Sequence, residues 1–205
     1  DWYGHRSSTV NFLSKDGTFV YDHVENLGVT ACYGTFFGNR FYAISKQDGG
    51  YGRISVCDAN STRVIKQIKD IDGKDGRSFC GVDEHKAYVS TSRGIYTLNL
   101  DELTVGAAVK NADGGDAELE ECGNMVRLGD YVYATEYGNS LRIIDCNTDR
   151  IAATITAKVY SITMSKDGQL WVSTNKGISR VNTESRQLED ITLPSGISAP
   201  AKSLA

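Results

Sequence analysis

The sequence predicts an all-β fold made of repeated small antiparallel sheets, and three registers of one repeat support this. A five-residue pattern that begins with Ile or Leu and ends on Asp or Asn occurs at 54–58, 95–99, 141–145 and 178–182. Ten positions after the start of each copy lies another apolar residue. An aromatic residue within an apolar run precedes each copy: Tyr42, Tyr88, Tyr133 and Trp171. Self-similarity at a period near 40 residues is typical of an architecture in which each unit is one supersecondary structure.

Each repeat is expected to contain four strands joined by tight turns. In the first complete repeat these strands are predicted at 29–37, 40–45, 53–58 and 63–68. Gly-Asn, Gly-Asp or Asp-Gly pairs precede several of the aromatic strands, as two-residue hairpins require. The recurring Asp or Asn at the end of the third strand can accept a hydrogen bond from the backbone two residues further on. We therefore expect those residues to close turns rather than to catalyse a reaction.

Four strands at this period are typical of a β-propeller blade, with a solenoid of four-stranded units or one irregular sandwich as alternatives. The predicted single domain, 1–205, is divided at the following bounds: a partial blade at 1–28, full blades at 29–70, 77–110, 122–156 and 159–193, and a tail at 194–205. The partial blade has two predicted strands, 8–14 and 18–23. We expect the chain to form part of a larger ring of about seven blades rather than to close as five. Its open strand edge would then pair with missing blades or with a partner chain.

Composition narrows the range of possible functions. The chain carries a net charge of −4 with scattered basic residues, which argues against a nucleic-acid partner. No apolar run approaches the ~20 residues of a transmembrane helix. The five cysteines lack the close spacing of zinc or redox motifs, so we expect small buried hydrophobic residues on strands. The acidic segment 70–77 lacks the Gly and Glu of an EF-hand loop, and no metal or cofactor is predicted.

Several segments resemble known propellers. Residues 52–65, GRISVCDANSTRVI, look like a YVTN-type propeller repeat. Residues 1–13, 81–88 and 123–126 are similar to secreted Bacteroidetes propellers of uncharacterised function. That resemblance implies an exported, often lipid-anchored protein in the periplasm or on the outer-membrane surface. Some members of this group capture small molecules, cobalamin among them, beside outer-membrane transporters.

Blade geometry predicts which loops share a face. The loop between the second and third strands lies on the same side as the connection to the next blade, and these loops are polar and aromatic. The ligand-binding residues predicted there are Trp2, Tyr3, His5, Arg6, Gln47, Arg77, Arg93, Glu136, Tyr137 and Lys176. Aromatic rings mixed with Arg and amide side chains suit a small polar ligand such as a glycan or a corrinoid.

No catalytic motif is recognisable: the three histidines are far apart, and G-x-S-x-G and phosphate-binding glycine loops are absent. The sequence therefore favours a non-catalytic binding or scaffold propeller. Two alternatives stay open. One is a propeller-fold enzyme, a lyase or hydrolase, which would need paired carboxylates in a cleft. The other is a protein–protein adaptor, which would need an exposed apolar patch.

Overall fold

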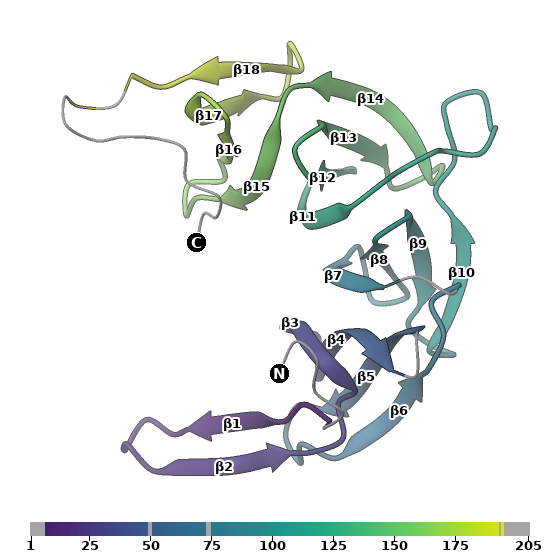
Figure 1. Cartoon of the computed structure of the whole chain (residues 1–205), viewed down its shortest axis with the longest axis vertical. Coiled ribbons are helices and arrows are strands. Elements are labelled where there is room, and N and C mark those ends of the chain that lie inside the picture. Colours follow the sequence, from purple (N-terminus) through teal and green to yellow (C-terminus); the bar gives the residue numbers. More distant parts are fainter. Residues whose placement is uncertain (1–6, 49–50, 73–74, 193, 195–205) are drawn as a thin grey trace. The chain divides into compact units, whose positions relative to one another are not determined.

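The structure is a computed structural model that describes residues 7–48, 51–72, 75–192 and 194. Within these residues there is no helix, and eighteen strands form four four-stranded sheets and one two-stranded sheet (Figure 1). All pairings between neighbouring strands that are recorded in these sheets are antiparallel. The predicted all-β class, with four full blades and a partial one, is therefore confirmed.

The chain divides into two compact units, which are described separately. Unit 1 comprises residues 1–91 and 98–106, and unit 2 comprises 92–97 and 107–205. Strands lying wholly in unit 1 are β1 (Val10–Leu13), β2 (Phe19–Val24), β3 (Val29–Phe37), β4 (Arg40–Asp48), β5 (Tyr51–Asp58), β6 (Val64–Ile68), β7 (Gly76–Gly81) and β8 (Lys86–Thr91). Strands lying wholly in unit 2 are β11 (Cys122–Leu128), β12 (Tyr131–Glu136), β13 (Ser140–Asp145), β14 (Arg150–Thr156), β15 (Val159–Met164), β16 (Leu170–Thr174), β17 (Gly177–Asn182) and β18 (Gln187–Asp190). The remaining strands, β9 (Gly94–Asn99) and β10 (Thr104–Ala108), contribute residues to both units.

Strand order within every four-stranded sheet follows the sequence, so each sheet is a simple meander. The Asx residues at the end of the third strands close the turns to the fourth strands, as predicted. The Asp58 carboxylate accepts hydrogen bonds from the N–H groups of Asn60 and Ser61 at 3.1 and 2.7 Å. Asn182 accepts the equivalent pair from residues 184 and 185. These residues have structural roles.

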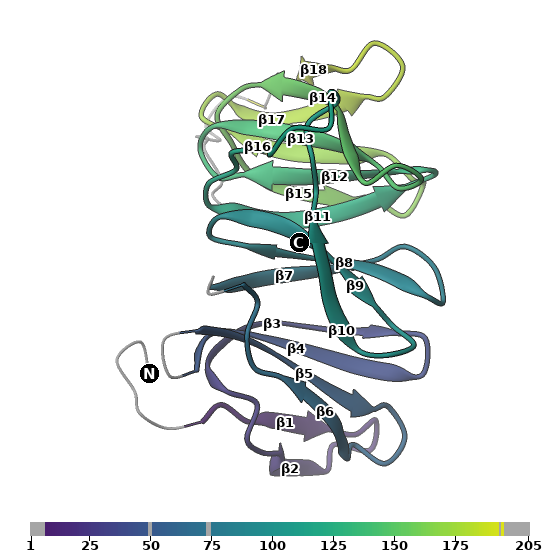
Figure 2. The ribbon, with the colours of Figure 1, turned by 90° about the vertical axis from the view of Figure 1, so that its right-hand side faces the viewer.

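The repeated aromatic residues build the packing between adjacent sheets. Tyr42, Tyr88 and Tyr133 are at most 3% exposed, and Trp171 is partly buried. In unit 1 the Tyr42 ring stacks on Phe79 of β7 with centroids 4.3 Å apart. In unit 2, where Figure 2 shows β11–β14 beside β15–β18, Tyr133 belongs to a core that includes residues of both sheets. Within each unit, adjacent sheets thus bury their faces against one another, as repeat units must.

The expectation of five buried cysteines on strands is wrong for two of them. Cys32 lies on β3, the edge strand of its sheet, and is exposed. Cys146 is buried but follows β13 rather than lying in it. The other three are buried strand residues, and all five thiols are free. Burial raises the pKa of Cys122 to about 12, so this thiol is protonated and unreactive at neutral pH.

The partial blade is the hairpin β1–β2, a two-stranded sheet. Five of its large apolar side chains are at least 38% exposed: Phe12, Leu13, Phe19, Val20 and Tyr21. A two-stranded sheet can bury little apolar surface by itself, which explains the exposure.

Candidate functional site

Backbone hydrogen bonds in unit 2 tie together the loops at one end of the sheets. The Glu121 N–H donates to the Ser92 carbonyl at 2.7 Å, and the Tyr137 N–H donates to the Glu121 carbonyl at 3.1 Å. The N–H of residue 138 donates to the carbonyl of residue 159 at 2.7 Å, and the Asn175 N–H donates to the Lys158 carbonyl at 3.2 Å. We call residues 92–93, 121, 136–139, 158–160 and 174–176 the loop ribbon. It links loops from three successive sheets into one hydrogen-bonded path.

The loop ribbon presents one aromatic ring and three cations to solvent. Tyr137 is 48% exposed, and its ring meets Tyr160 edge-on with centroids 5.2 Å apart. Arg93, Lys158 and Lys176 are exposed on the same ribbon. The turn that carries Tyr137 needs Gly138, whose φ of +71° is unfavourable for other residues. The ring therefore packs against Tyr160 on one side, and about half of the residue's surface is open to solvent.

Beneath the exposed side chains lies the carboxylate of Glu136, which is 3% exposed. It accepts hydrogen bonds from the Ser140 hydroxyl (2.7 Å), the Glu120 N–H (3.1 Å) and the Arg142 guanidinium (2.7 and 3.0 Å). Burial alone would raise its pKa, but these hydrogen bonds and the Arg142 charge outweigh burial and lower the pKa. Glu136 is thus ionised, and both of its carboxylate oxygens accept hydrogen bonds. These bonds anchor the loop that carries Tyr137.

A polar groove opens at the end of the loop ribbon in unit 2. Its cavity volume is about 560 Å³. It runs between the outer strands β14 and β18 of two adjacent sheets, with the loops at 157–158 and 175–176 at one end. Its polar lining consists of Thr154, Thr156, Lys158, Thr174, Asn175, Lys176, Arg186, Gln187 and Asp190. Hydroxyl, amide and cationic groups, with one carboxylate, therefore line this groove.

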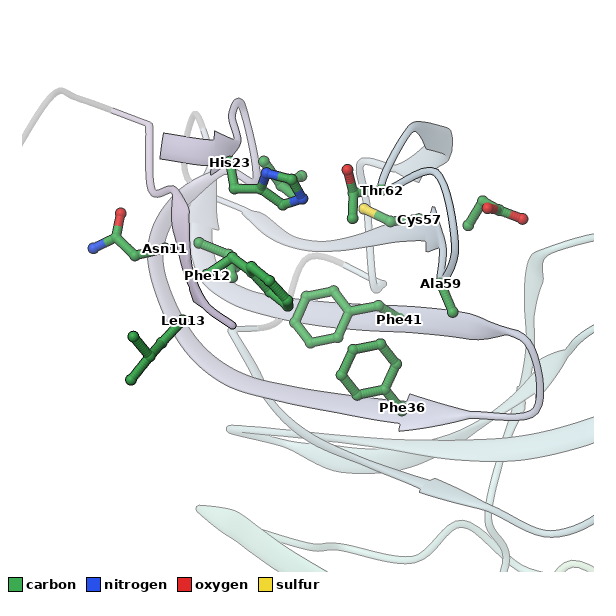
Figure 3. Close-up of a pocket in the computed structure, with 12 residues that line it drawn as sticks. Asn11, Phe12, Leu13, His23, Phe36, Phe41, Cys57, Ala59 and Thr62 are labelled. Atoms are coloured by element: carbon green, nitrogen blue, oxygen red, sulfur yellow. The ribbon is translucent and has the colours of Figure 1, made fainter. Parts of the chain in front are cut away.

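Unit 1 contains a different cavity, small and mainly apolar, with a volume of about 210 Å³. In Figure 3 the rings of Phe12, Phe36 and Phe41 gather there, while Leu13 points away. The turn at 58–62 borders this cavity. A turn as short as this one would not form a pocket by itself. The cavity arises because the hairpin β1–β2 packs beside the turn and supplies a second wall.

Comparison with known proteins places the chain in a family. The sequence model of a family described as a domain of unknown function, DUF5074, matches residues 1–205. The chain belongs to the DUF5074 family. Among solved structures, the WD40 β-propeller domain of Doa1 is similar, with a TM-score of 0.63 and 13% sequence identity. The match covers 80% of the DUF5074 chain and 54% of Doa1's, so this chain spans about half the length of that structure. No curated protein matches.

The structural similarity shows that the sheets of this DUF5074 chain are β-propeller blades. At this level of identity it shows the fold alone. The described part of the chain contains no helix with the length and apolar character needed to cross a membrane. Nor do the described residues include a group of three or more His, Cys, Asp or Glu side chains placed to hold a metal ion.

The predicted site residues of the DUF5074 chain fall into three groups. Arg93, Glu136, Tyr137 and Lys176 lie together on the loop ribbon. Arg77 lies in unit 1, partly buried on β7, with its guanidinium 4.0 Å from the Asp75 carboxylate. Four predicted residues, Trp2, Tyr3, His5 and Arg6, lie outside the described residues, as does the side chain of Gln47 on β4.

Two ribbon residues, Lys158 and Tyr160, were missed in the sequence. Lys158 lies in the connection between β14 and β15, and Tyr160 is the second residue of β15. The geometric rule used for the other loops places this connection on the same face. A search of the connections between blades, in addition to the loops within blades, would have found them.

Proposed function

We propose that this DUF5074 domain is a non-catalytic binding or scaffold propeller of the cell envelope that captures a small polar ligand on its loop ribbon. One observation carries the proposal: an exposed Tyr137 ring, fixed by Tyr160, stands among the exposed cations Arg93, Lys158 and Lys176 on one hydrogen-bonded path. An aromatic face can stack on a flat or ring-shaped ligand. Cationic donors beside it can bind the ligand's oxygen atoms.

The ligand classes that we propose are a glycan or a corrinoid. Both present ring faces for stacking and many polar groups at the rim. The resemblance of residues 52–65 to YVTN repeats and of residues 1–13 to secreted Bacteroidetes propellers supports an exported location, in the periplasm or on the outer-membrane surface. An outer-membrane transporter is the partner that this resemblance suggests.

The state of the buried carboxylate favours binding over catalysis. Glycoside hydrolysis typically needs two carboxyl groups about 5–9.5 Å apart, one of them free to donate a proton. Within the described residues, Glu136 is the one buried carboxylate, and its pKa is lowered rather than raised. A carboxylate held ionised by Arg142 is a poor general acid.

A protein partner is the second candidate function, because the hairpin β1–β2 exposes large apolar side chains. Tyr21 is 75% exposed and Leu13 is 64% exposed. Exposed apolar surface of this kind marks interaction sites, and an unpaired strand edge accepts further strands. A partner chain that pairs with the hairpin would cover this edge.

The binding proposal is tested by calorimetric titration of the full chain with a panel of neutral and acidic oligosaccharides and with cyanocobalamin. We expect at least one ligand to bind, and we expect Tyr137→Ala to weaken that binding by about 1–3 kcal/mol, the range for a lost stacking or polar contact. Tyr21→Ala is the matched control, since it removes an exposed tyrosine from the hairpin instead. Equal losses in both variants, or no binding by the parent chain to any ligand of the panel, would contradict the proposal.

A further inference from the structure

We infer that the polar groove of unit 2 binds an acidic saccharide, with the acid group at Lys158 and Lys176 and the sugar hydroxyls along β14 and β18. The inference rests on the proposed function, because the groove opens on the loop ribbon. It adds the chemical class of the ligand and the residues that would select it.

The charge of the groove is opposite to that of the chain. Three lining residues are basic, Lys158, Lys176 and Arg186, and one is acidic, Asp190. The chain as a whole carries a net charge of −4. A basic groove on an acidic protein attracts anions locally while the rest of the surface repels them. The groove is therefore matched to a negatively charged ligand.

The two lysines stand at the same end of the groove, on loops that are joined by a backbone hydrogen bond. The loop that carries Lys176 is joined to Lys158 by the hydrogen bond from the Asn175 N–H to the Lys158 carbonyl. The Lys176 N–H in turn donates to the Thr174 hydroxyl at 3.1 Å, which fixes the turn. Two ammonium groups on neighbouring, hydrogen-bonded loops can address one carboxylate or sulfate together.

The existing partners leave this end of the groove short of negative charge. The Asp190 carboxylate lies 4.0 Å from the Lys176 ammonium and also accepts a hydrogen bond from the Ser179 hydroxyl at 2.8 Å. No ion pair joins Lys158 to another described residue. Asp190 thus balances one lysine in part, and an incoming acid group would balance the other.

A third basic residue of the groove lining, Arg186, already has partners. The Arg186 guanidinium donates to the Ala152 carbonyl at 3.3 Å and lies over the Tyr131 ring, 5.8 Å from its centroid. These contacts engage the Arg186 guanidinium. We therefore assign the acid group of the ligand to Lys158 and Lys176 rather than to Arg186.

The walls of the groove favour hydroxyl groups over flat aromatic ligands. Thr154, Thr156 and Gln187 are exposed along its length, and none of its lining residues is aromatic. Hydroxyl and amide side chains can both donate to and accept from sugar hydroxyls. A nucleobase or corrin ring would find no stacking partner inside. The cavity volume of about 560 Å³ lies within the usual range for small-ligand sites, roughly 300–1,000 Å³.

The test compares a charged disaccharide with its neutral counterpart on the full chain. Digalacturonate, galactobiose and a galactose 6-sulfate probe are titrated at low and high salt, and affinities are measured by calorimetry. We expect digalacturonate to bind at least about tenfold more tightly than galactobiose, with the difference shrinking at high salt as screening increases. Binding of the sulfated probe alone would identify sulfate, rather than carboxylate, as the recognised acid.

The double variant Lys158→Gln/Lys176→Gln should abolish the preference for the acidic sugar while leaving thermal stability unchanged. Lys166→Gln is the matched control, because this exposed lysine lies on the 165–169 turn at the other end of β16. The inference is overturned if neither acidic probe binds better than the neutral sugar, or if the double variant keeps the preference. In those cases, a neutral glycan or corrinoid whose binding is weakened by Tyr137→Ala would still support the proposed function. If no such ligand binds either, the inference and the proposed function are both overturned.

Discussion

At the scale of single residues, the loop ribbon rests on a buried ion pair between Glu136 and Arg142. Glu136 and Arg142 face each other at 2.7 Å, with the carboxylate side chain 4% exposed and the guanidinium 21% exposed. The sequence identified Glu136 as a loop-face residue, but it could not show the orientation of its side chain. That orientation is set by Ser140 and Arg142 on β13, which approach only when the strands pair.

We expect Arg142→Ala to destabilise the chain by about 2–3 kcal/mol, because the buried carboxylate would lose its charged partner. Glu136→Gln should cost less and should change the acid response. Since the folded pKa of Glu136 is lowered, its contribution is present above the ordinary glutamate pKa of about 4.3 and is lost as the pH falls through the folded value. Urea unfolding at pH 7 and pH 3 measures both effects. An unchanged pH dependence in the glutamine variant would contradict this assignment.

At the scale of elements, strand bounds were most predictable where apolar alternation and turn residues agree. The strand at 29–37 was predicted at its observed bounds, whereas β4 continues three residues beyond its predicted end at 45. Residues 46–48 are polar, and Asp48 pairs with residue 51 of β5. The extension of β4 over these residues depends on pairing with β5, and polar residues give no hydrophobic periodicity from which it could be predicted. The apolar cavity was missed for a similar reason, since its two walls are distant in sequence.

Close packing between strands makes one glycine in unit 1 critical. A Cβ atom at Gly81 on β7 would lie 2.1–2.3 Å from atoms of the Phe37 ring. We expect Gly81→Ala to destabilise the chain by about 1–3 kcal/mol, the usual cost of overpacking. Gly115→Ala is the control, because its added Cβ would meet only the Asp113 side chain at 3.1 Å. Thermal unfolding of the two variants checks this, and equal midpoints would show that Phe37 can move aside at little cost.

At the scale of the whole molecule, the repeat established the fold class far better than the function. Period, aromatic register and turn chemistry all constrain backbone pairing, so the four full blades follow from them. Ligand identity depends on which side chains remain exposed once the loops are joined. The hydrogen bonds from residue 92 to residue 175 that place Arg93, Tyr137 and Lys176 on one path join distant segments and have no sequence signature. The blade count of a complete ring stays a prediction.

The most direct test of the loop ribbon as the binding surface is amide chemical-shift mapping of the isotope-labelled full chain. The titrant is the tightest ligand from the panel of oligosaccharides and cyanocobalamin. The largest shifts are predicted at residues 92–93, 137–139, 158–160 and 174–176. Shifts concentrated instead at the turn 58–62 and at Phe12 and Phe41, around the apolar cavity of unit 1, would contradict the account.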